Sequence, residues 1–253
     1  MDRIHDSFIL FKRCLLLSIR NVEALITAVM LPVVLMVVFV YLFGGAVETG
    51  ADTAYVNYVV PGVIVLCVSQ CAGITALSVN ADVSKGIADR FRSMPIAQSA
   101  LLTGHVLAST IRNCLTTALV ILVAVLIGFS PAAGLAQWLL AAGLLILYML
   151  VITWLAVLVG LAVKTPDSAG GMVFVVVILP YLSSGFVPTE TMPGILRAFS
   201  ENQPLTPVIE SLRSLFLYSS PGDRIFQALL WCAALLLAFS AAAAIVYKRK
   251  RKA

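Results

Sequence analysis

Three polar residues interrupt long apolar stretches of this chain and are the first candidates for chemistry. Gln70, Arg112 and Asn113 each lie within a hydrophobic run long enough to cross a membrane. Strongly polar groups are costly there and are functional candidates by default. Arg112 lies close enough to the end of its run to reach lipid headgroups or to hydrogen-bond a neighbouring helix, and we expect one of these roles before ligand contact. The three residues form a candidate intramembrane polar site.

Other patterns that would indicate chemistry are absent from the sequence. No Asp or Glu lies in the core of an apolar run, so the usual proton relay or sodium site of a secondary transporter is not expected. No G-x-x-x-x-G-K-[ST] phosphate loop occurs, so no ATP is expected to bind this chain. His5 and His105 are isolated, and the five cysteines lack metal or redox spacing, so we predict no catalytic, cofactor or metal site and no structural disulfide. An intramembrane enzyme is disfavoured because its nucleophile, base or metal is missing.

The composition indicates a protein that lies mostly in lipid. Hydrophobic residues make up 61% of the sequence and charged residues 11%, against roughly 25% charged residues in soluble domains. Backbone groups in hydrocarbon must be satisfied within their own segment, which predicts helices, and the alternation of a membrane barrel is absent. We predict one all-α integral membrane domain over residues 1–253, with six transmembrane helices at 24–43, 59–79, 106–128, 136–162, 170–187 and 225–247.

The distribution of lysine and arginine predicts the orientation of these helices. Basic residues gather before the first apolar run, between the second and third runs, and in the C-terminal tail, whereas the loops 44–58 and 129–135 have none. By the positive-inside rule both termini are cytoplasmic, and the segment between the last two spans is external. The net charge of +5 therefore reflects topology and attraction to membrane lipids, and no nucleic-acid partner is expected.

Residues 1–23 predict an amphipathic helix in the cytoplasmic interface. Its apolar face carries Ile4, Phe8, Phe11, Leu15 and Ile19, and its opposite face carries Asp6, Arg13 and Arg20. We expect the basic residues to point toward anionic headgroups. The alternative is a simple extension of the first span.

A second amphipathic segment, 82–95, lies in the first cytoplasmic loop. Lys85 and Asp89 form an i,i+4 pair, and Pro95 ends the predicted helix. Its apolar stripe consists of Val83, Ile87, Phe91 and Met94. Such a helix suits the groove of a partner protein, and the spacing leaves equally open a helix that rests on lipid.

The stretch 179–216 is apolar but broken by prolines, so it cannot form one spanning helix. We predict two short amphipathic helices, one at about 192–200 and one that starts at Thr206 as its N-cap with Pro207 at the first helical position. Each is far shorter than the ~30 Å hydrocarbon core requires. The segment 188–218 is therefore predicted to be re-entrant on the external side, with a surface loop as the alternative.

Two blocks carry a resemblance to a known family. In KGIADRFRSMP the family positions are occupied by Gly86, Asp89, Phe91, Ser93 and Pro95, with Ile87 in place of the common threonine. In the second block Pro204, Leu205, Thr206, Leu212 and Arg213 match, while Gln203 replaces asparagine and Pro207 replaces tyrosine. The chain resembles the membrane subunit (permease) of type-2 ABC exporters, and within them the daunorubicin/doxorubicin-resistance subgroup.

The resemblance implies a permease of the bacterial plasma membrane, paired with an identical or related second permease copy and with two cytoplasmic ABC ATPase subunits that bind ATP and Mg. The segment 82–95 would then be the helix that couples the permease to the ATPase, through Lys85, Gly86, Ile87, Asp89, Arg90, Phe91, Arg92, Met94 and Pro95. The external gate would comprise Pro193, Ile195, Leu196, Phe199, Pro204, Thr206, Val208, Leu212, Arg213 and Phe216.

We expect the cargo to be an amphipathic small molecule, a drug or antibiotic, because aromatic and aliphatic side chains dominate the spans. One alternative is a permease of the same family for a lipid, glycolipid or polysaccharide precursor, or for an ion. The other is a membrane scaffold without cargo.

Overall fold

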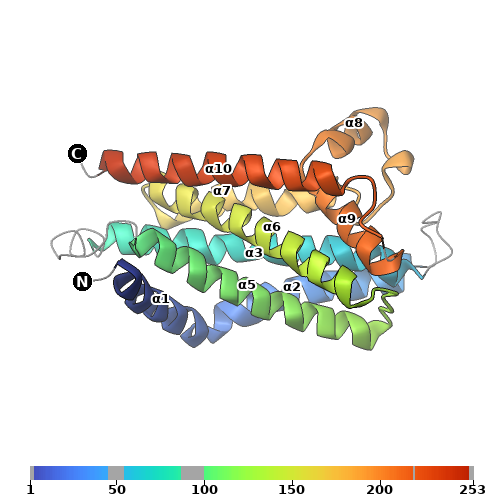
Figure 1. Cartoon of the computed structure of the whole chain (residues 1–253), viewed down its shortest axis with the longest axis horizontal. Coiled ribbons are helices and arrows are strands. Elements are labelled where there is room, and N and C mark those ends of the chain that lie inside the picture. The colour runs from blue at the N-terminus through green and yellow to red at the C-terminus, as the bar shows by residue number, and fades with distance from the viewer. Residues whose placement is uncertain (1–2, 45–53, 87–99, 219, 251–253) are drawn as a thin grey trace.

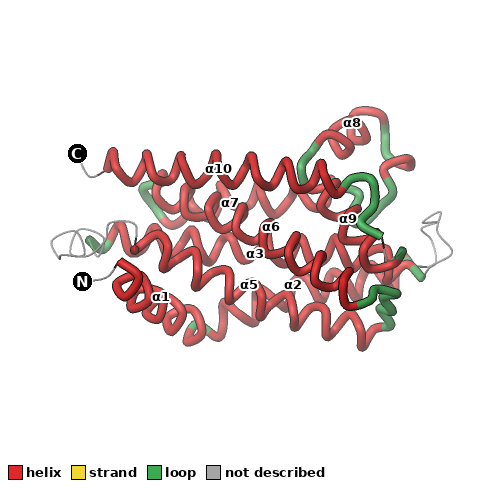
Figure 2. The backbone as a smooth tube through the Cα atoms, viewed as in Figure 1, coloured by secondary structure: helices red, strands yellow, loops and turns green. Residues whose placement is uncertain are grey.

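The computed structural model describes residues 3–44, 54–86, 100–218 and 220–250, and these residues form helices and no strand (Figures 1 and 2). The α-helices are α1 Arg3–Arg20, α2 Val22–Val38, α3 Tyr55–Ser84, α5 Ala100–Ile127, α6 Leu135–Ala162, α7 Pro166–Ile178, α8 Gly194–Asn202, α9 Leu205–Leu217 and α10 Ile225–Lys250. A π-helical turn, Phe39–Phe43, continues α2, and 3-10 turns lie at Leu179–Leu182 and Thr189–Thr191.

The long helices form a bundle along the long axis of the molecule (Figure 1). Both termini lie at one end, which we call the terminal end, and α8 and α9 lie at the other, which we call the far end. The most apolar stretches of α3 and α6 are 72% and 67% buried, against 17% in α2 and 11% in α10. The core of the chain therefore surrounds α3 and α6, while α2 and α10 present apolar side chains outward.

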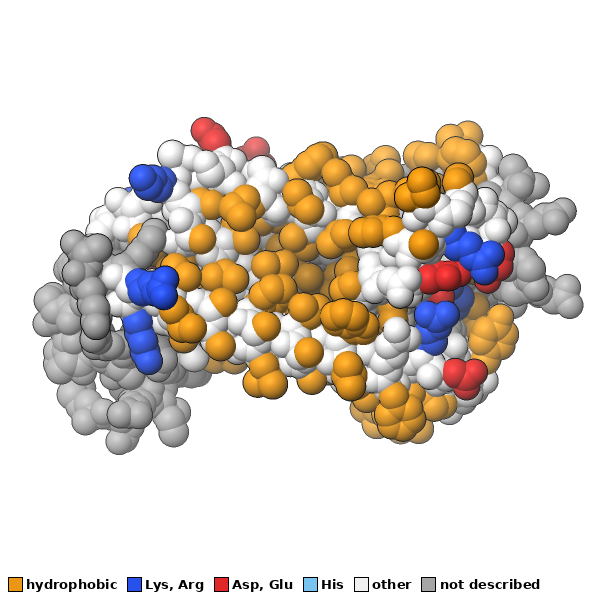
Figure 3. All heavy atoms as spheres, turned by 90° about the horizontal axis from the view of Figure 1, so that it is seen from above, with side chains coloured by type: hydrophobic (Ala, Val, Ile, Leu, Met, Phe, Trp, Pro, Cys, Tyr) orange, Lys and Arg blue, Asp and Glu red, His pale blue; other side chains and the backbone are white. Residues whose placement is uncertain are grey.

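The surface of the bundle fits a membrane environment. In Figure 3, hydrophobic side chains cover the middle of the visible face, and charged side chains lie toward the two ends. On α10, Phe226 is 81% exposed and both Leu230 and Leu237 are 70% exposed. Water would oppose this exposure, whereas lipid or a partner helix accommodates it.

Within the described ranges, five helical stretches are long and apolar enough to cross a membrane: Val22–Phe43, Tyr55–Ser84, Leu101–Ile127, Leu135–Ala162 and Ile225–Arg249. The predicted span at 170–187 differs from these. It is occupied by α7, which has 13 residues and begins at Pro166 after the N-cap Thr165, whose hydroxyl accepts a hydrogen bond from Ser168 N. A 3-10 turn containing Pro180 follows, because proline disrupts helical hydrogen bonding. At ~1.5 Å per residue α7 covers about 20 Å, so the six-span topology stays a prediction.

The helix predicted over residues 1–23 corresponds to α1, which packs against α5 of the bundle. In α1 the buried side chains include Leu10 and Cys14, whereas Phe11 and Leu15 are half-buried. Gly104 of α5 permits the close packing, because a Cβ there would lie 3.2 Å from backbone atoms of Leu10 and Phe11. The helix ends at Arg20, and the Asn21 side chain accepts a hydrogen bond from Ala24 N at the start of α2.

The end of α3 corrects the predicted start of the helix at 82–95. Asp82 lies in the last turn of α3, which continues to Ser84. Gly86 then adopts a left-handed conformation, with φ of 68°, which glycine tolerates and which commonly ends a helix. Asp82 therefore belongs to the bundle and not to a separate cytoplasmic helix. Residues 87–95 lie outside the described residues.

Near the far end, α3 passes very close to the segment that follows α7. A Cβ added to Gly62 would lie 2.6 Å from Gly185 O and 2.7 Å from Gly185 Cα. Both contacts are with backbone, which cannot rotate away as a flexible side chain can. This crossing therefore requires glycine at position 62.

We expect Gly62→Ala to destabilise the protein by about 1–3 kcal/mol, the usual cost of overpacking a core. A thermal melt of the detergent-solubilised chain measures the change. Gly143→Ala is the matched control on α6, because a Cβ there meets nothing within 4 Å, and alanine favours a helix interior more than glycine does. An unchanged melting temperature for Gly62→Ala would contradict the close crossing.

Candidate functional site

Arg213 of α9 forms the centre of a polar cluster at the far end. Its Nε donates to Tyr58 O at 3.2 Å and its Nη2 donates to Ser184 O at 2.6 Å. The guanidinium carbon also lies 3.7 Å from the centroid of the Tyr58 ring, which is within cation–π range. Arg213 is 9% exposed, and burial lowers its pKa. One buried cation thus joins α9, α3 and the segment after α7.

Two tyrosines of α3 complete this far-end cluster, which consists of Arg213, Tyr55, Tyr58, Ser184 and Phe186. The Tyr55 hydroxyl donates to Phe186 O at 2.7 Å, and the Tyr58 hydroxyl donates to Ser184 O at 3.0 Å. The segment 183–187 forms a turn outside the helices, and buried carbonyl groups need donors. Side chains of α3 and α9 supply them, which holds the irregular segment against the bundle.

The connection between α8 and α9 corrects a local prediction. Thr206 is not an N-cap, because it lies inside α9, which begins at Leu205 after Pro204. Its hydroxyl instead donates to Ser200 O at 2.6 Å, and Gln203 Nε2 donates to Leu182 O at 2.7 Å. These bonds tie the end of α8 to the start of α9 and to the 3-10 turn after α7.

The residues predicted to form the external gate separate into two groups. Those on α9 are core residues of this chain: Thr206, Val208, Leu212 and Phe216 are at most 1% exposed, while Pro204 is half-buried. Those on and before α8 are exposed: Pro193, Ile195, Leu196 and Phe199, with Ile195 at 88%. Only the α8 group presents an apolar face outside the chain, since the apolar face of α9 packs on α6 and α3.

An ion-pair cluster at the terminal end was missed by the sequence reasoning. Arg13 donates from Nη1 and Nη2 to the two carboxylate oxygens of Asp82, at 2.8 and 3.0 Å. His105 Nε2 lies 3.1 Å from Asp82 Oδ2. The hydrogen bonds that Arg13 donates to the Asp82 carboxylate raise the pKa of Arg13. The expectation that Arg13 points to headgroups is therefore wrong, because it pairs with Asp82. The sequence does contain a signal for this pair: Asp82 is an isolated acid just after an apolar run, and the N-terminal amphipathic helix is rich in basic residues.

Arg112 lies deeper between α1, α3 and α5 and makes interhelical hydrogen bonds. Its Nη1 donates to Ser18 Oγ at 2.8 Å, and its Nη2 donates to Thr75 Oγ1 at 2.7 Å and to Cys71 O at 3.3 Å. The residue is 4% exposed. Of the two structural roles expected for Arg112, the structure shows hydrogen bonding to neighbouring helices. These hydrogen bonds attach α1 to the bundle at a second place, apart from the Arg13–Asp82 pair.

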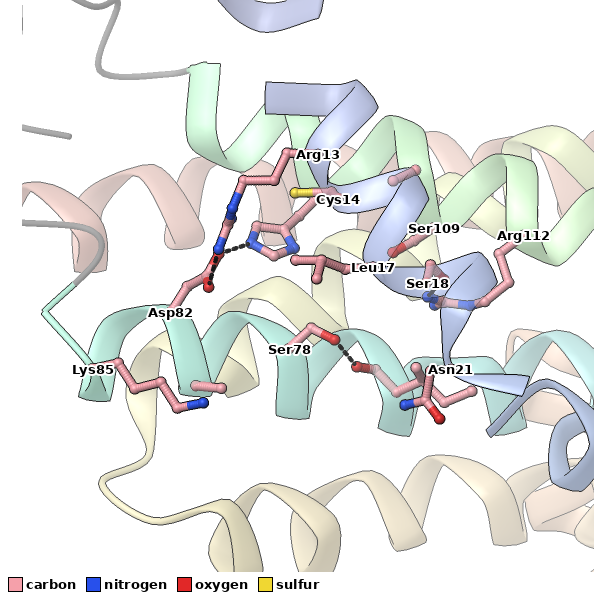
Figure 4. Close-up of a pocket in the computed structure, with 14 residues that line it drawn as sticks. Arg13, Cys14, Leu17, Ser18, Asn21, Ser78, Asp82, Lys85, Ser109 and Arg112 are labelled. Atoms are coloured by element: carbon pink, nitrogen blue, oxygen red, sulfur yellow. Dashed lines mark hydrogen bonds and ion pairs between the residues drawn. The ribbon is translucent and has the colours of Figure 1, made fainter. Parts of the chain in front are cut away.

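The candidate intramembrane polar site is divided between separate places. Arg112 lines a cavity of about 360 Å³ between α1, α3 and α5 (Figure 4). Gln70 lines a groove of about 470 Å³ with residues of α2 and α7. Asn113 is 1% exposed, and its Oδ1 has no hydrogen-bond partner among the described residues. The five cysteines are all free.

The predicted ATPase-coupling residues are described only in part. Lys85 caps the end of α3 and is exposed, and Gly86 follows it in the left-handed conformation. The remainder lie outside the described residues: Ile87, Asp89, Arg90, Phe91, Arg92, Met94 and Pro95. The coupling role of this segment stays a prediction.

Comparison with known proteins identifies the class of this arrangement. Residues 6–217 match the ABC-2 type transporter family. The chain is 31% identical over 192 residues to the daunorubicin resistance ABC transporter permease protein DrrB1 of Streptomyces coeruleorubidus, covering 76% of this chain and 68% of that protein. It is 23% identical over 230 residues to the probable doxorubicin resistance ABC transporter permease protein DrrC of Mycobacterium tuberculosis (strain CDC 1551 / Oshkosh), covering 91% of this chain and 83% of that protein. The chain therefore belongs to the ABC-2 type transporter family, among the multi-pass membrane permeases of its drug-exporter subgroup.

Proposed function

We propose that this chain is the membrane half of an ATP-driven exporter that moves an amphipathic small molecule, a drug or antibiotic, out of the cell. Membership of the drug-exporter permeases supports the transport role. The 253 residues contain no phosphate-binding loop, so ATP and Mg bind to two separate ATPase subunits. Both termini lie in the cytoplasm of a bacterial cell, which places the far end of the bundle outside.

The single observation that supports the mechanism best is the continuity of α3. Its 30 residues cover about 45 Å and connect the two polar clusters. At the far end Tyr58 contacts Arg213 of α9, and at the terminal end Asp82 binds Arg13 of α1. A push on the segment 82–95 by a closing ATPase dimer is transmitted along the continuous helix α3 to α9, which adjoins the external α8.

The route for cargo is the groove between α2, α3 and α7. Its lining residues include Leu31, Gln70, Gly73, Phe174 and Tyr181. In a single chain the α7 side is open, since Phe174 is 62% exposed. A glutamine amide that faces lipid leaves polar groups unsatisfied, whereas a second permease copy or a cargo molecule provides partners. We therefore place a second permease copy, identical or related, against this groove, with the cargo route between the two copies.

The apolar face of α8 closes this route on the external side. Ile195, Leu196 and Phe199 are exposed in the single chain, and the contacts of Gln203 and Thr206 fix α8 to its neighbours. A movement of α9 is thereby passed to α8. Cargo binds one of the two states better, since only differential affinity biases such a change.

The test uses the tagged permease copurified with its ATPase and reconstituted in vesicles. ATP hydrolysis is measured after addition of an anthracycline, a glycolipid or sodium ions. We expect stimulation by the anthracycline, and we expect Gln70→Leu to lose most of it. Gln227→Leu, on the exposed side of α10, is the matched control and keeps the stimulation.

Each other outcome has a definite meaning. Stimulation by the glycolipid or by sodium alone would replace the drug with another cargo. Copurification of no ATPase would support a scaffold and overturn the exporter. Equal stimulation of the wild type and Gln70→Leu would overturn the groove as the route.

A further inference from the structure

A polar cavity lies toward the terminal end of the bundle and is lined by other residues than the groove that contains Gln70. Residues of α1, α3 and α5 enclose about 360 Å³, which is within the range of small-ligand sites. Of the described residues, three with cationic side chains line it, Arg13, Lys85 and Arg112, together with one carboxylate, Asp82. In Figure 4, Lys85 and Arg112 extend toward the middle of this cavity from opposite ends.

The cations of the cavity are not fully neutralised among the described residues. Asp82 accepts both hydrogen bonds from Arg13 and lies against His105. Among the described residues that line the cavity, no other acid is left to pair with Arg112 or Lys85. The Arg112 Nε is buried and has no hydrogen-bond partner in the described part of the chain. A buried guanidinium with no carboxylate beside it is costly, and an anion in the cavity would supply the missing negative charge.

We propose that this cavity binds the phosphate group of an anionic phospholipid. Phosphate oxygens accept hydrogen bonds from Arg112 and Lys85, and the polar side chains of Ser18, Asn21 and Ser78 line the same space. The cavity lies at the end that the basic residues predict to be cytoplasmic, where anionic lipids attract lysine and arginine.

The surroundings of the cavity favour a lipid over a soluble anion. Leu17 both lines the cavity and is 55% exposed, so the rim is apolar on the side of α1. Apolar residues that follow or precede lining residues in the chain are also exposed, among them Val22, Ile26 and Leu77. An acyl chain can lie along such a surface while its headgroup occupies the cavity, whereas free phosphate gains nothing from it.

Bound in this way, the lipid would connect α1 to α3 and α5 next to the segment 82–95. The inference does not depend on the exporter function, because lipid binding is measured on the permease alone. Failure of the ATPase experiment therefore leaves it standing, and failure of lipid binding leaves the exporter standing.

The test is native mass spectrometry of the full chain in detergent, titrated with phosphatidylglycerol, with phosphatidylcholine of the same acyl chains, or with inorganic phosphate. We expect one phosphatidylglycerol molecule per chain to bind more tightly than phosphatidylcholine. Lys85→Gln should weaken that binding about fivefold, because this factor corresponds to the attraction of one lysine to an anionic lipid surface. Arg112→Gln should weaken it further. Arg197→Gln, on exposed α8, is the control and should bind as the wild type does.

Lys85 is exposed, so its variant tests the site even where Arg112→Gln fails to fold. Equal binding of the two lipids, or equal binding by Lys85→Gln and Arg197→Gln, would overturn the proposal. Displacement of phosphatidylglycerol by inorganic phosphate would contradict a lipid as the ligand and would indicate a site for a free anion.

Discussion

Replacing Arg213 with methionine should sharply reduce the stability of the permease. The change removes two hydrogen bonds from a charged donor, to Tyr58 O and Ser184 O, and the cation over the Tyr58 ring. Each hydrogen bond to a charged group contributes roughly 1.5–3 kcal/mol. The Tyr58 hydroxyl still donates to Ser184 O, which limits the loss. We expect a decrease of about 3 kcal/mol in the free energy of unfolding, measured by thermal or denaturant unfolding in detergent.

A second arginine at the same end serves as the control. Arg224 forms an ion pair with Glu210 at 3.0 Å, with the arginine side chain 41% exposed. Exposed pairs contribute about 0–1 kcal/mol, so Arg224→Met should unfold nearly as the wild type does. Arg213→Lys keeps the charge but loses the planar fork of donors, and should fall between the two. Equal stability of Arg213→Met and Arg224→Met would show that Arg213 does not hold the far end together.

Replacing Phe91 with aspartate should abolish ATP-coupled export while the chain still inserts into the membrane. Phe91 is predicted to belong to an apolar stripe that fits a groove on the ATPase, and a carboxylate there would lose apolar contact and be costly to bury. Export of the anthracycline from cells or inverted vesicles measures the effect, and membrane fractionation measures insertion.

Phe91→Leu is the matched control, because it keeps an apolar side chain of similar size and should retain most of the export. Normal export by Phe91→Asp would remove the coupling role from this segment. A defect in insertion would instead indicate that the segment rests on lipid. The length of α3 explains how a change at Phe91 can affect the other end of the bundle. A push at residues 82–95 acts on a helix that contacts Arg213 at its other end.

The sequence determined the helical class and the approximate positions of the helices. Long apolar runs such as those of α6 and α10 are local signals, because a helix in lipid must satisfy its own backbone and be apolar along most of its length. The same local signals identified the two short helices after α7. They failed at boundaries where proline or glycine interrupts the pattern, as at Pro180 after α7 and at Gly86 after α3.

The tertiary structure alone decided which neighbour covers each helix face and which partner each buried polar group takes. The sequence predicts that Arg13 points toward lipid headgroups, whereas in the structure it binds Asp82, 69 positions away. Phe216 was expected at a gate and is a core residue, with its ring edge-on to Phe129 at 5.9 Å between centroids. Helical periodicity shows that a face is apolar, but lipid, a second chain and the rest of the same chain all satisfy an apolar face equally. Only the packing of distant segments distinguishes them.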